Sequence, residues 1–199
     1  MRIGIIGGGH IGGNLGTLWA AAGHAIMYGL RDVTKYRDLL EHTGAQAGSP
    51  AEAAQFGEVV LAAIGWPAMR EVIPALGDLT GKILIDPSNR FAAQAGDSGS
   101  AAEDVAHMAR GARVIKAFNT IGAETLLKPE FGTTRATTFV CGDDAHAKTV
   151  VMDLARDAGL DAVDAGSLAS AALVESATRL WFALSQRYGR DIAFCLLRR

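Results

Sequence analysis

The sequence predicts an α/β fold: a Rossmann-like, doubly wound, mostly parallel sheet with helices on both faces and a long C-terminal helix. Three observations predict it. Short β-rich apolar runs alternate with segments of helical periodicity, as in strand–helix–strand units. A glycine-rich turn joins the first run to the first periodic segment. The chain has 199 residues, 49% of them hydrophobic, which is enough for one well-buried domain and too little for two.

The expected strands are the apolar runs at residues 3–6, 25–28, 59–64, 83–85, 114–117, 137–141 and 161–163. Helical periodicity predicts helices over residues 11–22, 67–76 and 147–158, each followed by a glycine that ends it. Residues 49–52 form a capping-box pattern with a proline at the first helical position, so a short helix is expected to start there. A further helix is expected near residues 101–109.

The last long helix is expected at about residues 168–188. One side of it carries Val174, Ala177, Trp181, Leu184 and Tyr188. We therefore expect one domain over residues 1–199, with residues 167–199 as a helical C-terminal extension. The irregular stretch at residues 90–100 fits either a lid or an ordinary surface loop.

Composition excludes several classes of protein. The formal net charge of -2 argues against nucleic acid or anionic lipid as the main partner. Cys141 and Cys195 lack metal-site or disulfide spacing, so we expect no metal. Glycines interrupt the apolar N-terminal run, and no stretch reaches the roughly 20 apolar residues of a membrane span. A soluble cytoplasmic protein without a membrane partner is expected.

The turn Gly7-x-Gly9-x-x-Gly12 has the spacing and the strand–helix context of a dinucleotide-binding loop. Gly7 allows the tight turn, Gly9 lets a pyrophosphate approach, and Gly12 lets the helix pack close to the strand. The N–H groups around Gly9, His10 and Ile11 would then point at the phosphates from a helix N-terminus.

The residues after the second expected strand bear on which dinucleotide binds. An NAD site usually has an acidic residue there, whereas this chain places Arg31 closest to the strand end. A guanidinium matches the 2'-phosphate of NADP, and Lys35 adds a second positive charge. Asp32 is the alternative, as the acidic ribose ligand of an NAD enzyme. The sequence favours NADP(H), and the whole chain is then one NADP(H)-binding domain.

With these residues in view, the chain resembles the F420:NADP oxidoreductases, the NADPH-dependent reductases of the deazaflavin coenzyme F420. The resemblance lies in residues 1–12 (MRIGIIGGGHIG), Arg31, Lys35, residues 86–89 (DPSN) and residues 114–122 (VIKAFNTIG). The KAFNT pattern is also similar to the cytosolic domain of the transmembrane metal reductases, which pass electrons from NADPH to a flavin. Two departures are Leu30, where the family usually has serine, and the longer segment at residues 90–100.

Ligands of doubly wound sheets lie across the C-terminal ends of the strands, which makes the residues after each strand candidates. The resemblance places the Trp66 segment beside the nicotinamide, and Asn119 and its neighbours near the nicotinamide and the acceptor. Ordinary packing is the alternative for Trp66, and a self-capped turn for Asn89. The predicted cofactor-binding residues are Gly7, Gly9, His10, Ile11, Gly12, Leu30, Arg31, Lys35, Ile64, Gly65, Trp66, Pro67, Ser88, Asn89, Ala117, Asn119 and Thr120.

No acid–base constellation emerges, so no catalytic side chain is predicted. Each of the five histidines except His10 fits a surface or cap position. The absence suits a ring acceptor, which takes up a hydride and spreads the charge, so that positioning matters most. The predicted function is therefore an NADP-dependent oxidoreductase.

Three readings of the acceptor stay open. The first is coenzyme F420, whose acidic tail predicts a basic patch from Arg90, Arg113, Lys116, Lys128 and Arg135. The second is flavin, or a metal chelate reduced through flavin. The third is a non-enzymatic NADPH sensor that contacts a partner protein through its last helix. Core packing or a homodimer surface explains that apolar helix more simply, and a homodimer is expected.

Overall fold

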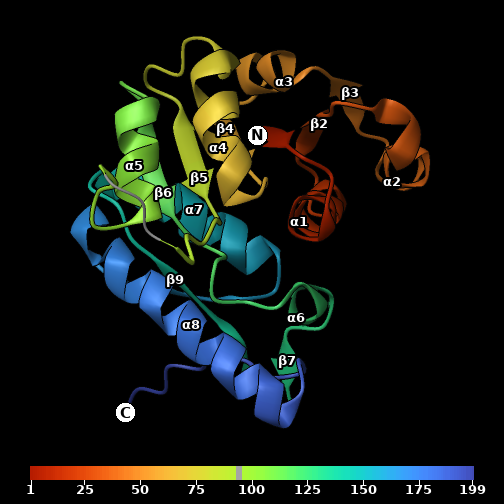
Figure 1. Cartoon of the computed structure of the whole chain (residues 1–199). Helices are drawn as coiled ribbons and strands as arrows, with labels where there is room; N and C mark the ends of the chain where they lie inside the picture. The colour runs from red at the N-terminus through yellow and green to blue at the C-terminus, as the bar shows by residue number, and fades with distance from the viewer. Residues whose placement is uncertain (93–95) are drawn as a thin grey trace.

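The computed structural model describes residues 1–92 and 96–199. Its centre is a six-stranded sheet in the order β3-β2-β1-β4-β5-β6, and every neighbouring pair of these strands is parallel (Figure 1). The predicted doubly wound fold is thereby confirmed. The strands are β1 (Arg2–Ile6), β2 (Ala25–Gly29), β3 (Gln46–Gly48), β4 (Val59–Ala62), β5 (Ile83–Asp86) and β6 (Arg113–Lys116).

Helices cover both faces of this sheet. One apolar cluster joins one face of the strands to α1 (His10–Ala21) and α7 (Ala145–Asp157), which are linked by a hydrogen bond of 2.8 Å from the Trp19 indole to the Leu154 carbonyl. A second cluster joins the other face to α3 (Pro50–Phe56), α4 (Trp66–Val72), η2 (Ile73–Leu76) and α5 (Ala101–Met108). The short η1 (Val33–Tyr36) and α2 (Arg37–Thr43) follow β2.

Alternation within β1 explains how both faces are filled. Ile3 and Ile5 belong to the first cluster and Ile6 to the second, as the two-residue period of a strand requires. Between them, Gly4 lets α3 rest directly on the strand, because a Cβ there would lie 2.0 Å from the Ala53 carbonyl oxygen. β1 and α3 are thus in close backbone contact.

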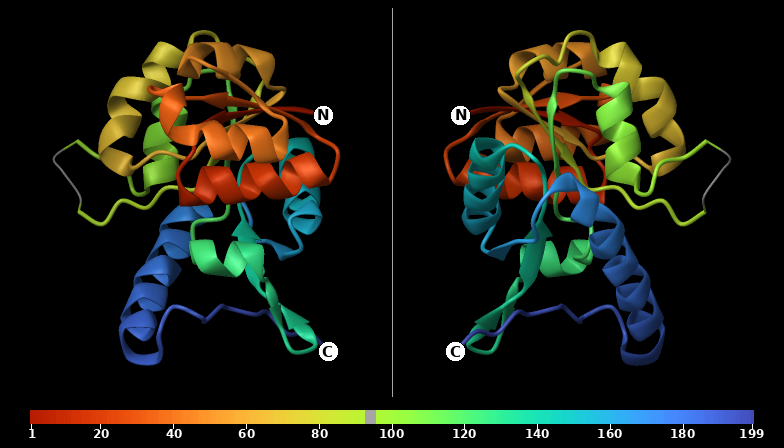
Figure 2. Two further views of the ribbon diagram at one scale, coloured as in Figure 1. Left: turned by 90° about the vertical axis from the view of Figure 1, so that its right-hand side faces the viewer. Right: turned by 90° about the vertical axis from the view of Figure 1, so that its left-hand side faces the viewer.

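The remaining elements lie beside this three-layer body. β9 (Thr137–Val140) and β10 (Asp161–Asp164) form a parallel pair, which one antiparallel bridge from Cys141 to Lys116 joins to the end of β6. Below the sheet in Figures 1 and 2 lie α6 (Ala123–Leu127), the pair β7 (Glu130–Phe131) and β8 (Thr134–Arg135), and the long α8. η3 (Leu168–Ser170) leads into α8 (Ala171–Tyr188).

The structure confirms the long C-terminal helix and corrects the face on which it packs. Its buried residues include Val174, Thr178, Trp181 and Ser185, whereas Tyr188 is 64% exposed. The apolar pattern on one side is therefore not the packing face along the whole helix. The helix ends at Tyr188, as expected. Residues 189–199, expected as part of a helical extension, instead return without helix toward β9, where the Thr137 N–H donates to the Phe194 carbonyl at 2.9 Å.

The local signals for the other helices are confirmed. Ser49 and Glu52 form the predicted capping box of α3, and Gly23, Gly77 and Gly159 follow their helices with positive φ angles. Within residues 1–92 and 96–199, no helix combines the length and hydropathy of a membrane span.

Candidate functional site

The glycine-rich turn has the geometry that its spacing predicts. Gly7 has a φ of +99°, and a Cβ there would lie 2.6 Å from the Ala63 carbonyl oxygen. A Cβ on Gly12 would lie 2.2 Å from the Gly7 oxygen, so α1 packs closely against the turn. At Gly9, in contrast, a Cβ would meet nothing within 4 Å. The turn is tight where glycine is needed for packing and open where a ligand would approach.

The start of α1 faces this open space. Gly9 is the residue before the helix. The first hydrogen bond of the helix runs from the Gly13 N–H to the Gly9 carbonyl at 2.7 Å. The preceding N–H groups, on His10, Ile11 and Gly12, are the ones that a helix leaves without an internal acceptor. Together with the helix dipole they favour an anion. His10 itself is exposed.

Leu30 and Arg31 follow β2 but take opposite places. Leu30 is only 6% exposed and belongs to the apolar core, and its side chain lies next to Gly8. Its predicted role is therefore corrected to that of a core residue that supports the turn. Arg31 is exposed, and it makes no hydrogen bond or ion pair with any described residue. Its guanidinium is available to a ligand.

Asp32 is already occupied within its own turn. Its Oδ1 accepts hydrogen bonds from the Thr34 N–H at 3.1 Å and the Thr34 hydroxyl at 2.5 Å. Lys35 Nζ lies 3.7 Å from its Oδ2. The hydrogen bond from the Thr34 hydroxyl, more than any other contact, holds the pKa of Asp32 below its ordinary value. The carboxylate caps η1, so part of its acceptor capacity is used within its own turn.

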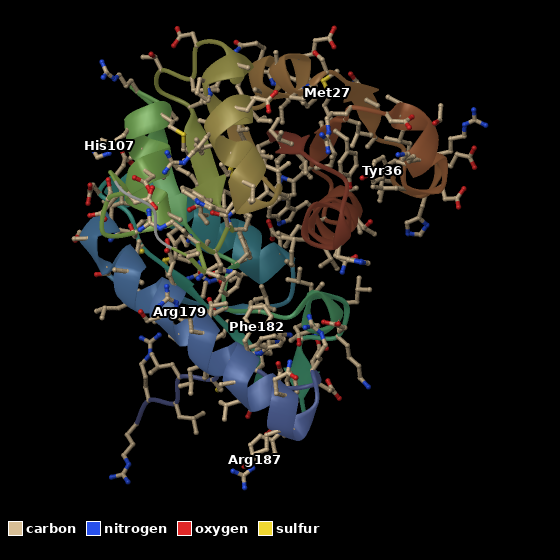
Figure 3. The ribbon with its side chains drawn as sticks, viewed as in Figure 1. Met27, Tyr36, His107, Arg179, Phe182 and Arg187 are labelled. Carbon is tan, nitrogen blue, oxygen red and sulfur yellow. The ribbon has the colours of Figure 1, made fainter. Side chains whose placement is uncertain are left out.

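A cavity of about 440 Å³ adjoins this region. Its lining comes from the start of α1 and from η1 and α2, and Figure 3 labels Tyr36 beside α2. Lys35, which the sequence predicts as a ligand of the 2'-phosphate, lines the same cavity as the glycine turn. The lining residues are Gly8, Gly9, His10, Gly13, Asn14, Thr17, Lys35, Tyr36, Asp38 and Leu39.

The segment after β4 also lies at the C-terminal ends of the strands, near the glycine-rich turn. Ile64 is half-buried, and its Cγ2 would lie 3.0 Å from a Cβ on Gly7. Gly65 caps α4, which begins with Trp66 and the exposed Pro67. Trp66 is half-buried against the second apolar cluster, so it packs and also borders the edge.

Arg90 lies over Trp66, with its guanidinium carbon 5.7 Å from the ring centroid. It is 8% exposed and forms ion pairs with Asp104 and, at 3.4 Å, with Asp97. Arg70 also pairs with Asp97. This network ties the segment after β5 to α4 and α5. Residues 93–95, on which part of the proposed lid falls, lie outside the described residues.

A buried ion-pair network lies beneath the ends of β5 and β6. Lys116 is fully buried, and its Nζ lies 2.9 Å from Asp86 Oδ2 and 2.9 Å from Glu175 Oε1. It also donates to the Ser88 carbonyl at 2.5 Å. Glu175 in turn accepts the first N–H groups of α5, from Ala101 and Ala102. Lys116 therefore joins β5, β6, α8 and α5 at one point.

The residues after β6 are buried, and one of them, Asn119, bonds to α8. Phe118 has a φ of +64°, which is unusual for a bulky residue, and its N–H donates to the Thr138 hydroxyl at 3.0 Å. Asn119 then donates through Nδ2 to Thr178 at 2.9 Å and to Asn89 at 3.2 Å. Asn89 donates back to the Asn119 carbonyl at 3.1 Å, so the self-capped turn considered for Asn89 is wrong.

Several buried polar atoms at this edge remain without a protein partner in the described chain. They include Ser88 Oγ, Asn119 Oδ1 and Thr120 Oγ1. Ala117, by contrast, is fully buried, and its N–H donates to the Asp86 carbonyl at 3.3 Å. Neither its methyl group nor its N–H is therefore open to a ligand. Unpaired buried polar atoms call for a partner, and their position at the strand ends is where a ligand of this fold would lie.

Comparison with known proteins identifies the family. The family model for "NADP oxidoreductase coenzyme F420-dependent" matches residues 2–90. The F420-dependent NADP reductase of Methanothermobacter marburgensis is 31% identical over an alignment of 206 positions that covers 90% of each chain. The chain belongs to this family of reductases. It is thus a member of a family of NADP-dependent oxidoreductases.

One further relative and one solved structure are also similar to this reductase. The rat metalloreductase STEAP3 is 32% identical over 177 residues, which cover 88% of the chain but 36% of the metalloreductase. The chain therefore spans about a third of that relative. A solved structure from Arthrobacter sp. FB24, described as an F420-dependent NADP reductase, matches over the whole of both chains with a TM-score of 0.89 and 26% identity.

The structure does not assemble the basic patch predicted for the reductase. Arg113 donates to the Gly81 carbonyl at the N-terminal end of β6, opposite the site. Lys116 is buried in its ion-pair network, and Arg90 is paired with two carboxylates. Lys128 and Arg135 are exposed on the segment that carries α6 and β8. The five residues are dispersed, and the prediction of one patch is wrong.

Sequence reasoning missed residues that complete the site from α8. Glu175 and Thr178 bond to Lys116 and Asn119, and they come from a helix that was expected to pack on the core or to contact another chain. One signal was present: Lys116 ends an otherwise apolar run, so a buried partner of opposite charge was required.

Proposed function

We propose that this reductase transfers a hydride between NADP(H) and a bound ring cofactor, with the deazaflavin coenzyme F420 as the first candidate acceptor. The observation that carries the proposal is the contrast after β2, where Arg31 is exposed and unpaired while Asp32 is held by Thr34. A free guanidinium beside an open phosphate turn favours a dinucleotide with a 2'-phosphate.

The residues present fit NADP(H). Open space at Gly9 and the unpaired N–H groups at the start of α1 suit the pyrophosphate. Arg31 and Lys35 would hold the 2'-phosphate. The buried atoms Ser88 Oγ and Asn119 Oδ1 offer polar partners at the other end of the site. When bound, the nicotinamide supplies the hydride, and the chain's own residues position it and exclude water.

The side chains at the strand ends favour positioning over proton transfer. Asn89, Asn119 and Thr178 hold one another, and Ser88 and Thr120 carry neutral hydroxyls. A conjugated ring acceptor needs little more than alignment with the donor. A carbonyl or imine substrate would instead call for a placed proton donor.

The test is an acceptor panel. The purified protein is mixed with NADPH and, separately, with F420, FAD and FMN, and the loss of nicotinamide absorbance is followed. Turnover that is fastest with F420 is expected. Turnover with FAD or FMN alone would contradict F420 and favour the second candidate. Tight NADPH binding without turnover on any acceptor would refute the hydride-transfer proposal and favour an NADPH-binding sensor.

A flavin, or a metal chelate reduced through flavin, is the second candidate acceptor. The observation that favours it is the 32% identity to the rat metalloreductase over 88% of the chain. The same geometry of the turn and of Arg31 serves both candidates, so only the acceptor panel separates them.

We further propose that the protein forms a homodimer through α8. Leu173 and Leu180 are 75% and 54% exposed, and Ala177 and Leu184 continue the same side of the helix. Light scattering is expected to give the mass of two chains, and Leu180→Glu to shift it to one. Leu127→Glu, at a leucine 61% exposed on α6, is the control. A monomeric wild type would refute the dimer. The cytoplasmic location stays a prediction.

A further inference from the structure

One side of α8 looks toward the proposed cofactor site. Glu175, Arg179 and Phe182 are spaced by four and then three residues, so they share that side. Glu175 fixes its direction, because it bonds to Lys116 and to the start of α5 beneath the strand ends. In Figure 3, Arg179 and Phe182 lie along the middle of the helix, whereas Arg187 points away near its C-terminal end.

Phe182 presents a partly exposed aromatic ring on this side. Its ring centroid lies 5.2 Å from that of Phe91 and 5.2 Å from that of Trp181, both in edge-to-face geometry. Trp181 is itself 3% exposed and donates from its indole to the Ile192 carbonyl at 3.0 Å. Phe182 and Phe91 remain 37% and 57% exposed. The protein thus holds two aromatic rings in place at its surface.

These rings are continuous with the proposed nicotinamide side of the site. Phe91 directly follows Arg90, whose guanidinium lies over Trp66. One residue earlier, Asn89 is bonded to Asn119. The aromatic surface therefore begins at Phe91, two residues after Asn89, in the segment that follows β5.

Arg179 adds a positive charge beside these rings. It is exposed, and its Nη2 donates to the Arg90 carbonyl oxygen at 3.5 Å. Among residues 1–92 and 96–199 it has no carboxylate partner. An unneutralised guanidinium next to exposed aromatic rings matches a flat ring that carries an anionic group.

We propose that Phe91, Phe182 and Arg179 form the acceptor subsite. The two phenylalanines contact the fused ring of the acceptor, and Arg179 binds its phosphate or carboxylate. This assignment rests on the proposed hydride transfer and narrows it to an anionic fused-ring acceptor. It also replaces the five-residue patch expected from the sequence with one cation on α8.

The first test separates the anionic group from the ring. FMN and riboflavin share one ring system, and FMN alone carries a phosphate, so isothermal titration of both to the NADP-bound protein isolates that group. Arg179→Ala is expected to weaken FMN and F420 binding about three- to tenfold and to leave riboflavin unchanged. Arg187→Ala, another exposed arginine on α8, is the matched control and is expected to change neither.

The second test addresses the ring contact. Phe182→Ala is expected to weaken FMN, riboflavin and F420 binding alike, by about three- to tenfold, and Phe182→Tyr to retain it. Affinity for NADPH and the thermal unfolding midpoint serve as controls of folding. Wild-type acceptor affinities in both Arg179→Ala and Phe182→Ala would overturn the subsite. If the wild type binds or turns over no ring acceptor, the proposed function itself fails first.

Discussion

Removal of the Arg31 guanidinium should separate NADPH from NADH. Arg31 is exposed and has no ion pair with the described part of the chain, so Arg31→Ala leaves no buried charge and should fold normally. A hydrogen bond to a charged group contributes about 1.5–3 kcal/mol. Solvent screens this exposed site, so we expect the lower limit, about a tenfold loss of NADPH affinity.

Isothermal titration of NADPH and NADH to the wild type and to Arg31→Ala measures this loss. NADH lacks the 2'-phosphate, so its affinity is expected to stay unchanged. The loss for NADPH should shrink as ionic strength rises. Arg37→Ala is the control, because Arg37 is also exposed but begins α2 and does not lie directly after β2. Equal losses for both dinucleotides, or equal effects of the two substitutions, would refute the assignment of Arg31.

Three further predictions concern stability and reactivity. Lys116→Met should lower the free energy of unfolding by about 3–5 kcal/mol, because it leaves buried carboxylates without a partner. Lys148→Met should lower it by less than about 1 kcal/mol, because Lys148 and its partner Asp164 are 15% and 50% exposed. Urea unfolding checks both, and equal losses would contradict the network. Hydrogen bonds within its capping box hold the pKa of Glu52 below the ordinary value of 4.5, so its contribution is complete above that value and is lost as the pH falls through the lowered pKa. Glu52→Gln should therefore lower the unfolding temperature at neutral pH and cease to do so in strong acid. Burial raises the pKa of Cys141 to about 11, while Cys195 is exposed, so a thiol reagent should modify Cys195 rapidly and Cys141 only on unfolding. Rapid modification of both thiols in the folded protein would contradict this difference.

The fold could be predicted wherever a local signal coincided with an element. The turn at Gly7, the capping box at Ser49 and the glycine after each helix all identify their elements from a few neighbouring residues. β3 was missed because its three residues, Gln46–Gly48, are too few and too polar to show strand alternation. The same holds for α2, whose seven residues have no fully buried member.

The site could be predicted only in part. In one half of it the residues lie close together in the sequence, and in the other half the residues that bond to one another lie far apart in the sequence. The turn and Arg31 belong to one strand–helix–strand unit, whose spacing is readable. Asn119, in contrast, bonds to Thr178, which lies 59 residues further along the chain. Nothing local could show that α8 supplies this partner, or that Glu175 of the same helix pairs with Lys116.

The central claim is that hydride passes directly from NADPH to a ring acceptor held beside it. Its most direct test uses NADPH that carries deuterium at the transferred position, with F420 as the acceptor and mass spectrometry of the reduced product. Direct transfer predicts that the reduced deazaflavin carries the deuterium, because a carbon–deuterium bond on that ring does not exchange with water. Reduced F420 without deuterium, or no reduction of F420 at all, would contradict the claim.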